Sequence, residues 1–176
     1  MGMLTNGRID IAAPAADVFA WLVEPAKLTA WLGASGGMPE DTSQLKAGWS
    51  STSDSPPLGK VTVELMAYDP PTHLEYRQTY TGGDSISTYR LTEGDGVTTL
   101  SLEGDTDWAR PEGAWDEAID KALAGQPEEF RAAAEEKLDE VEDQLESGKF
   151  DSMAQGQMQQ AVDSSLQKLK ALIEAS

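Results

Sequence analysis

The sequence of 176 residues contains no cysteine and a single histidine, His73. The lack of cysteine excludes disulfides, thiolate nucleophiles and cysteine-ligated zinc. The lack of further histidines excludes a metal site built from several imidazoles and leaves one side chain that ordinarily titrates near neutral pH. With no metal or cofactor motif elsewhere, we expect a protein that works with no metal and no cofactor.

Basic residues and long apolar runs are also scarce. The chain has 13 Lys and Arg against 31 Asp and Glu, for a net charge of −18. Phosphate backbones and anionic membrane surfaces attract basic proteins, so neither nucleic acid nor a membrane is an expected partner. No apolar run approaches the roughly 18 residues of a membrane-spanning helix, and no basic stretch leads into an apolar block. The sequence therefore predicts a cytoplasmic protein.

The chain is organised around residues 9–33, IDIAAPAADVFAWLVEPAKLTAWLG. Alternating apolar positions predict a strand over 6–11, with residues 1–5 as a loose end. A proline at the first helical turn predicts a helix over 14–22, and Pro25 breaks it and begins a second short helix that ends at Gly33. Their apolar positions, such as Phe19, Leu22 and Trp31, are expected to be packing residues first.

Alternation between turn signals predicts a series of antiparallel strands after this stretch. The expected strands cover residues 47–53, 59–68, 73–80, 85–92 and 97–105. Within the second of them, strict alternation places Ala67 with Val63 and Leu65 on one face and Tyr68 on the other. Glycine-rich turns at 82–84 and 93–96 indicate hairpins. With helices before and after the strands, the class is α+β.

The last third of the chain is predicted to be helical. Residues 112–149 carry 13 acidic and 4 basic side chains, so half of the net charge lies there. The final helix is expected over 151–174, where apolar residues recur at three- and four-residue steps: Met158, Val162, Leu166, Leu169 and Ile173. An alternative is that the main packing helix begins near Gly113, with 151–174 packed elsewhere.

Several stretches in this order resemble the Bet v 1-like, or START-like, superfamily, also called SRPBCC. They are IDIAAPAADVFAWL, AWLG, LKAGWS, GKVTVELMAYDPPTHLEYR, STYRLTEGDGVTTLSL and SSLQKLKALIE. Within the superfamily, they look most like the bacterial homologues of the activator of Hsp90 ATPase. The resemblance covers residues 6–107 and 151–174, and the acidic segment between them departs from it.

The resemblance implies a helix-grip fold, in which a curved antiparallel sheet wraps around a long C-terminal helix. Residues 1–176 would then form one START-like domain: strand 1, two short helices and the sheet over 6–107, an acidic helical insertion over 108–150, and the C-terminal helix over 151–174. Members of this superfamily bind hydrophobic molecules between sheet and helix. They share no catalytic motif, so no catalytic residue can be transferred to this chain.

Candidate ligand-binding residues are polar or aromatic side chains expected to face such a cavity. Strand alternation assigns Tyr76, Gln78, Tyr80 and Tyr89 to its inner wall, where tyrosine hydroxyls could orient an apolar ligand. Trp31 and Trp49 are expected near its entrance, and Met158 and Val162 on the last helix would complete the lining. Ordinary core packing is the alternative for each. His73, Arg77 and Arg90 have the opposite parity and are expected at the surface.

We therefore expect non-catalytic binding of a hydrophobic or aromatic small molecule. Two alternatives remain at this point. The acidic segment 112–149 could dock onto a chaperone or another protein partner. The domain could instead be a cyclase- or hydrolase-like enzyme that uses tyrosine and acidic side chains.

Overall fold

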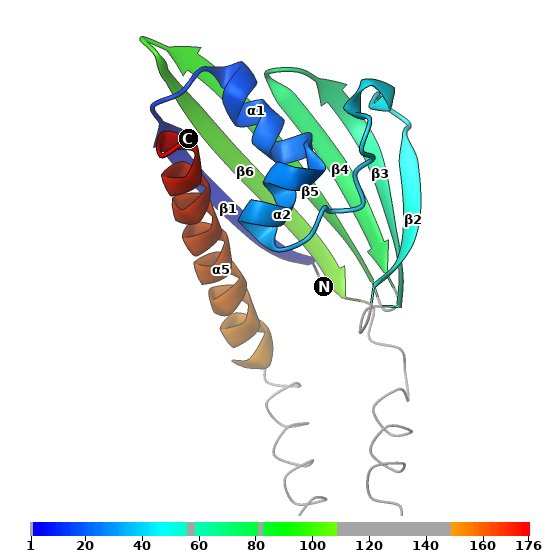
Figure 1. The fold of residues 1–176 in the computed structure, drawn as a ribbon. Coiled ribbons are helices and arrows are strands. Elements are labelled where there is room, and N and C mark those ends of the chain that lie inside the picture. Colours follow the sequence, from blue (N-terminus) through cyan, green and yellow to red (C-terminus); the bar gives the residue numbers. More distant parts are fainter. Residues whose placement is uncertain (1, 56–58, 81–82, 109–148) are drawn as a thin grey trace, which may run out of the picture.

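A computed structural model of the chain describes residues 2–55, 59–80, 83–108 and 149–176. Nearly all of the predicted acidic segment, with its predicted helices, lies outside these ranges. The described strands form one antiparallel sheet in the order β1-β6-β5-β4-β3-β2, and helices cover one of its faces (Figure 1). The strands are β1 (Gly2–Ile11), β2 (Ser50–Ser55), β3 (Gly59–Asp69), β4 (His73–Tyr80), β5 (Gly83–Gly94) and β6 (Val97–Trp108). The helices are α1 (Ala15–Val23), α2 (Pro25–Leu32), the short 3₁₀ helix η1 (Thr42–Gln44) and α5 (Lys149–Glu174).

The predicted α+β class and helix-grip fold are confirmed. Hairpins connect β3 to β4, β4 to β5 and β5 to β6, as the turn residues indicate. The β5–β6 turn shows why its sequence is suited to a hairpin. Asp95 and Gly96 both have positive φ, 54° and 76°, which aspartate tolerates and glycine adopts freely.

Several sequence predictions about the strands are wrong. Residues 2–5 are part of β1, because their partners in β6, Gly104 to Asp107, continue the ladder. The strand expected over 47–53 begins only at Ser50. In β3, a register shift between Leu65 and Ala67 inserts one residue and reverses the alternation. Tyr68, expected on the outer face, therefore packs on the core, where its ring meets the edge of Phe19 at 5.7 Å between centroids.

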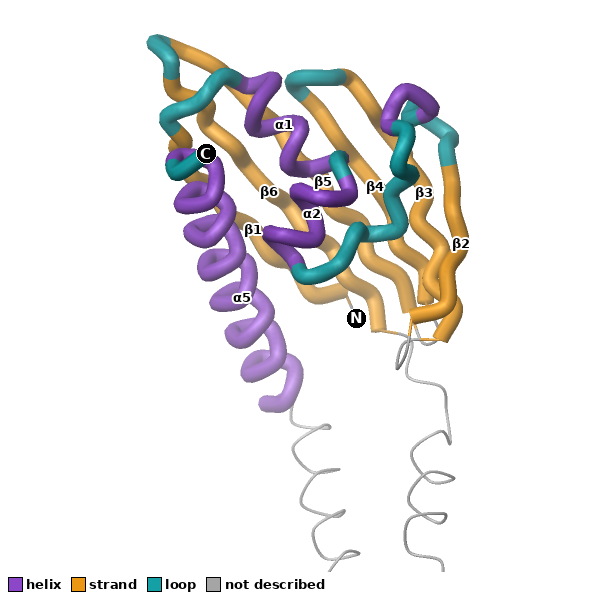
Figure 2. The backbone as a smooth tube through the Cα atoms, in the orientation of Figure 1, coloured by secondary structure: helices purple, strands orange, loops and turns teal. Residues whose placement is uncertain are grey.

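Both short helices lie on the inner face of the sheet, the face that carries the core. The backbone N–H of Ala15 in the first turn of α1 donates to the Glu93 carboxylate at 2.8 Å, which pins this end to β5. Gly33 ends α2 as predicted, with φ 83° and its N–H bonded to the Thr29 carbonyl. From there, the loop 33–49 crosses the inner face toward β3 and β2 (Figure 2), burying Met38 and Leu45.

The C-terminal helix α5 lies along β1 and against α2. The predicted apolar stripe is confirmed, since Leu166, Leu169 and Ile173 are all buried in the core. The alternative is that the main packing helix begins near Gly113. It stays untested, because that segment lies outside the described residues.

Polar side chains of α5 also bond to the free backbone edge of β1. Gln159 bonds to both the N–H and the carbonyl of Asn6, and Gln155 donates to the Leu4 carbonyl. Further along, Lys170 donates to the Asp10 carbonyl, and Glu174 accepts from the Ala12 N–H. These bonds occupy backbone groups that an edge strand otherwise leaves available to another chain.

At Gly7, side chains of α5 lie close against β1. A Cβ atom placed on this glycine would lie 2.5 Å from Leu166 Cδ1 and 3.0 Å from Val162 Cγ1. Gly7→Val should therefore displace the helix and destabilise the fold by about 1–3 kcal/mol, measured by thermal or urea unfolding. Gly94→Val is the matched control, because Gly94 has no neighbour within 4 Å. Equal stability of the two variants would contradict this account of the helix contact.

Candidate ligand-binding site

Cross-strand pairing divides the inner face into lines of side chains that run across the sheet. One line joins Gly7, Leu102, Tyr89 and Leu74, and the next joins Thr5, Gly104, Ser87, Tyr76 and Leu65. A further line joins Met3, Thr106, Ser85, Gln78, Val63 and Ser51. From the end of the sheet covered by α1 and α2 toward the other end, the inner-face side chains change from leucine and isoleucine to serine, threonine, glutamine and tyrosine. The inner face therefore has an apolar half under α1 and α2 and a polar half beyond them.

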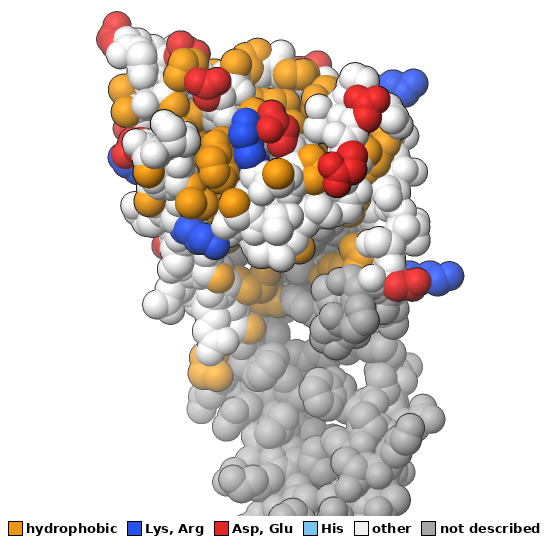
Figure 3. All heavy atoms as spheres, viewed as in Figure 1, with side chains coloured by type: hydrophobic (Ala, Val, Ile, Leu, Met, Phe, Trp, Pro, Cys, Tyr) orange, Lys and Arg blue, Asp and Glu red, His pale blue; other side chains and the backbone are white. Residues whose placement is uncertain are grey.

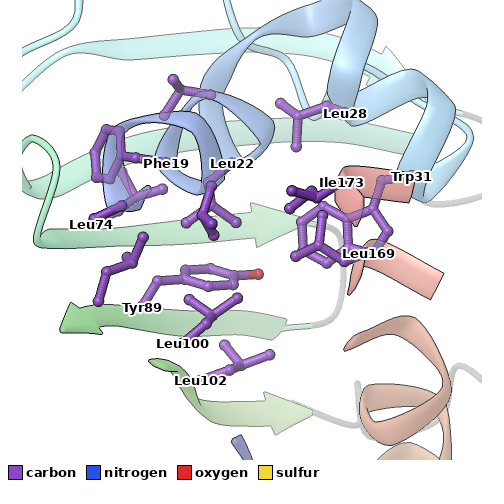
Figure 4. Close-up of a cluster of buried hydrophobic side chains, with 14 of the residues drawn as sticks. Phe19, Leu22, Leu28, Trp31, Leu74, Tyr89, Leu100, Leu102, Leu169 and Ile173 are labelled. Atoms are coloured by element: carbon purple, nitrogen blue, oxygen red, sulfur yellow. The ribbon is translucent and has the colours of Figure 1, made fainter. Parts of the chain in front are cut away.

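The apolar half is filled by packed side chains (Figure 4). Phe19 and Leu22 from α1, Leu28 and Trp31 from α2, and Leu169 and Ile173 from α5 converge on the sheet. The predicted packing roles of Phe19, Leu22 and Trp31 are thus confirmed.

The polar half consists of Thr5, Tyr76, Gln78, Ser85, Ser87 and Thr106. Thr5 and Thr106 are buried, whereas the other four side chains are half-buried. Gly104 lies between Thr5 and Ser87 and leaves room for the Thr5 hydroxyl, which would be 2.5 Å from a Cβ atom placed on this glycine. The polar half lies at the end of the sheet where β6 ends and α5 begins (Figure 1).

Two tyrosines mark the border between the halves. Tyr76 and Tyr89 stack with ring centroids 6.0 Å apart, and their hydroxyl oxygens are 3.4 Å apart. The Tyr89 ring is 5% exposed, and its hydroxyl points toward Leu169 and Trp31 (Figure 4). Burial, followed by the neighbouring Tyr76, raises the pKa of Tyr89 well above its usual value near 10. Tyr89 therefore stays neutral and positions the more accessible Tyr76 hydroxyl.

The two tryptophans expected near the entrance have different surroundings. Trp31 is 3% exposed; its indole N–H donates to the Ser165 carbonyl at 2.8 Å, and Lys168 donates to the Trp31 carbonyl at 2.6 Å. This reciprocal pair of bonds joins α2 to α5. Trp49 is half-buried, and its carbonyl accepts from the Leu65 N–H, which brings it into the line that contains Tyr76.

The remaining predicted lining residues lie on β4 and on α5, near the border between the two halves. Gln78 and Tyr80 follow Tyr76 on β4, and both are half-buried. Burial, then Asp84 and Asp107, raises the pKa of Tyr80. On α5, Val162 lies over Gly7 and packs on the core, and Met158, one turn earlier in the helix, is half-buried. Ligand contact by any of these residues stays a prediction.

Sequence reasoning missed much of the polar half. Ser85 and Ser87 lie two and four residues before Tyr89 on β5 and therefore share its face, so strand parity alone could have assigned them to the inner face. Thr5 was beyond reach, because a loose end was expected before residue 6. Thr106 was equally hidden, since the last strand was expected to end at 105.

The outer face carries the charged residues that alternate with the polar half on the same strands. Arg77 lies 3.6 Å from the Asp84 carboxylate across the β4–β5 pair, as expected for a surface residue. His73 has its Nδ1 3.7 Å from the Asp69 carboxylate, and its side chain is 23% exposed. The prediction that His73 faces solvent is therefore only partly right: it lies on the outer face but is half-buried there. Arg90, opposite His73, is exposed.

The helix-bearing face shows hydrophobic side chains with a few acidic and basic ones between them (Figure 3). Among the described residues, no group of three or more acidic or histidine side chains is placed to hold a metal ion. No helix in the described ranges has the length and apolar character needed to cross a membrane.

Comparison with solved structures places the fold among bacterial proteins of similar size. Protein MLL2253 from Mesorhizobium loti superimposes with a TM-score of 0.58 at 15% identity, over 98% of each chain. Protein CV1439 from Chromobacterium violaceum gives a TM-score of 0.54 at 16% identity, over 98% of this chain and 97% of the other. These likenesses concern the fold. No curated protein matches the sequence.

An antiparallel sheet with two short helices after strand 1 and a long C-terminal helix defines a helix-grip protein of the SRPBCC superfamily. Within it, the chain belongs to the family described as polyketide cyclase / dehydrase and lipid transport, which it matches over residues 5–174. The match includes the whole polar half as well as the docked part of α5.

The burial of Tyr89 predicts a loss of stability at alkaline pH. Because its folded pKa is raised, the folded state keeps a proton that the unfolded chain releases above about pH 10. The contribution of Tyr89 to the free energy of unfolding should therefore be constant below that pH. It should fall as the pH rises above it. Tyr89→Phe should show a shallower alkaline decrease in Tm than the parent protein. Tyr68→Phe is the comparison: burial also raises the pKa of Tyr68, but this side chain is only partly buried, so the effect of its substitution should be smaller. Parallel pH profiles for Tyr89→Phe and the parent would contradict this assignment.

Proposed function

We propose that the polar half of the inner face binds an aromatic or otherwise hydrophobic small molecule. The observation that supports this most directly is the Tyr76–Tyr89 pair, which places a hydroxyl at the boundary of an apolar core. Binding sites for small molecules commonly combine an apolar wall with a few fixed polar groups. The family's description as cyclases, dehydrases and lipid carriers agrees with a ligand of this kind.

In this proposal, the ligand's apolar body lies against the border of the core while its oxygen atoms reach Tyr76 and Gln78. Trp49 would cover one side of the ligand from the line that it shares with Tyr76. Val162 and Met158 would contact it from α5. Trp31 and Tyr89 are buried behind this surface, so we assign them positioning roles: Trp31 holds α5, and Tyr89 holds Tyr76.

Other functional expectations stay predictions. They are the closer likeness to the homologues of the activator of Hsp90 ATPase, the docking of a protein partner by 112–149, and the cytoplasmic location. A cyclase- or hydrolase-like activity would use the same surface, with Tyr76 as the polar group nearest the bound molecule. We favour binding because the buried polar side chains of the polar half are two threonines, Thr5 and Thr106. Their hydroxyl groups can orient a ligand by hydrogen bonding.

A direct test measures the affinity of the full chain for 2-naphthol and 2-naphthamide by equilibrium dialysis. Tyr76→Phe removes one hydroxyl and keeps the ring, so affinity should fall about 3- to 10-fold, the value of one hydrogen bond. Thr79→Val is the control, because it removes a hydroxyl three residues further along β4, from a side chain that is exposed on the outer face. Unchanged affinity in Tyr76→Phe, or equal losses in the two variants, would count against this site.

A further inference from the structure

The two lines that contain the polar half have a common chemical property: none of their members is charged. In the described strands, these lines hold hydroxyl, amide, aromatic, aliphatic and thioether side chains together with one glycine. The charged residues that alternate with these lines on β4 and β5, such as Arg77 and Asp84, lie on the outer face. The wall of the proposed site is therefore polar and neutral.

The nearest described charges would not compensate an anion there. Lys168 is engaged with the Trp31 carbonyl at the junction of α2 and α5. Asp84 and Asp107, which pair with each other on the outer face, add to burial in favouring the neutral form of Tyr80. An anionic ligand on the inner face would thus meet hydroxyl and amide groups on the wall and no cationic side chain within its two lines.

An anion loses hydration when it is bound against such a wall, and without a cationic partner this loss is not recovered. A neutral oxygen atom loses much less, because a single hydrogen bond to a hydroxyl or amide replaces its water. The same effect keeps the buried Tyr89 hydroxyl protonated. The neutral polar side chains that line the site should therefore favour neutral ligands over anionic ones.

We propose that the polar half selects uncharged ligands, taking hydrophobic molecules that carry a neutral hydroxyl, carbonyl or amide and rejecting the same skeletons with a carboxylate. This inference rests on the proposed function and adds a rule for its ligands. It separates neutral phenols, ketones and amides from fatty acids and other amphiphilic carboxylates.

The test compares 2-naphthamide with 2-naphthoate, which have nearly the same shape and differ in charge at neutral pH. Affinities are measured by equilibrium dialysis in about 0.5 M salt, so that the overall negative charge of the protein is largely screened. The parent protein should bind the amide at least about tenfold more tightly than the carboxylate.

Introducing a cation should reduce this preference only on the inner face. Gln78→Lys places an ammonium in the polar half, and carboxylate affinity should rise relative to the amide by about tenfold. Thr79→Lys adds the same charge one residue away on the outer face and should leave the ratio unchanged. Ser85→Lys, opposite Gln78 on β5, is a second inner-face variant should the first not fold.

The outcomes separate this inference from the proposed function. Binding of the amide with equal or tighter binding of the carboxylate would overturn charge selection and leave the binding function standing. A ratio that shifts equally in Gln78→Lys and Thr79→Lys would also overturn it, because the wall would then not be responsible. Failure of the parent to bind either compound would overturn the binding function, and charge selection with it.

Discussion

The docking of α5 against β1 is the contact on which the rest of the structure depends. Burying Leu166, Leu169 and Ile173 contributes roughly 1.5–3 kcal/mol for each side chain, whereas each hydrogen bond from α5 to the strand edge adds about 0.5–1.5 kcal/mol. The apolar stripe therefore supplies most of the energy. The polar bonds fix the register of the helix along the strand and occupy the backbone groups of an otherwise open edge.

This contact also places the helices that close the core. Trp31 and Lys168 exchange hydrogen bonds between α2 and α5, so the short helices cannot shift independently of the long one. Because α1 and α2 cover only the apolar half, the sheet extends beyond them with serine, threonine and glutamine facing inward. The candidate site is thus a consequence of how far the helices reach along the strands.

The proposed chemistry follows from the same arrangement. Tyr89 lies within the core and Tyr76 at its border, so one hydroxyl is shielded and the other is available. Neutral groups line the wall because the charged residues that flank it on β4 and β5, such as Arg77 and Asp84, fall on the opposite parity. In our proposal, a domain built this way holds a hydrophobic molecule and orients its uncharged oxygen atoms. This view agrees with a family that includes cyclases, dehydrases and lipid carriers.

The sequence by itself determined the helix-grip class, the order of the described elements, the hairpin turns and the buried stripe of α5. The helix-grip class followed from the resemblance of several stretches to a known superfamily, whereas the other features depend on local periodicity and on residues such as Gly33 and Gly96 that act within a few positions. Tertiary structure decided what periodicity cannot encode. The bulge after Leu65 moved Tyr68 to the core, and pairing with β6 drew residues 2–5 into β1 and brought Thr5 into the polar half. Both outcomes depend on partners far away in the chain, because register is set by pairing between strands and by what each face must bury.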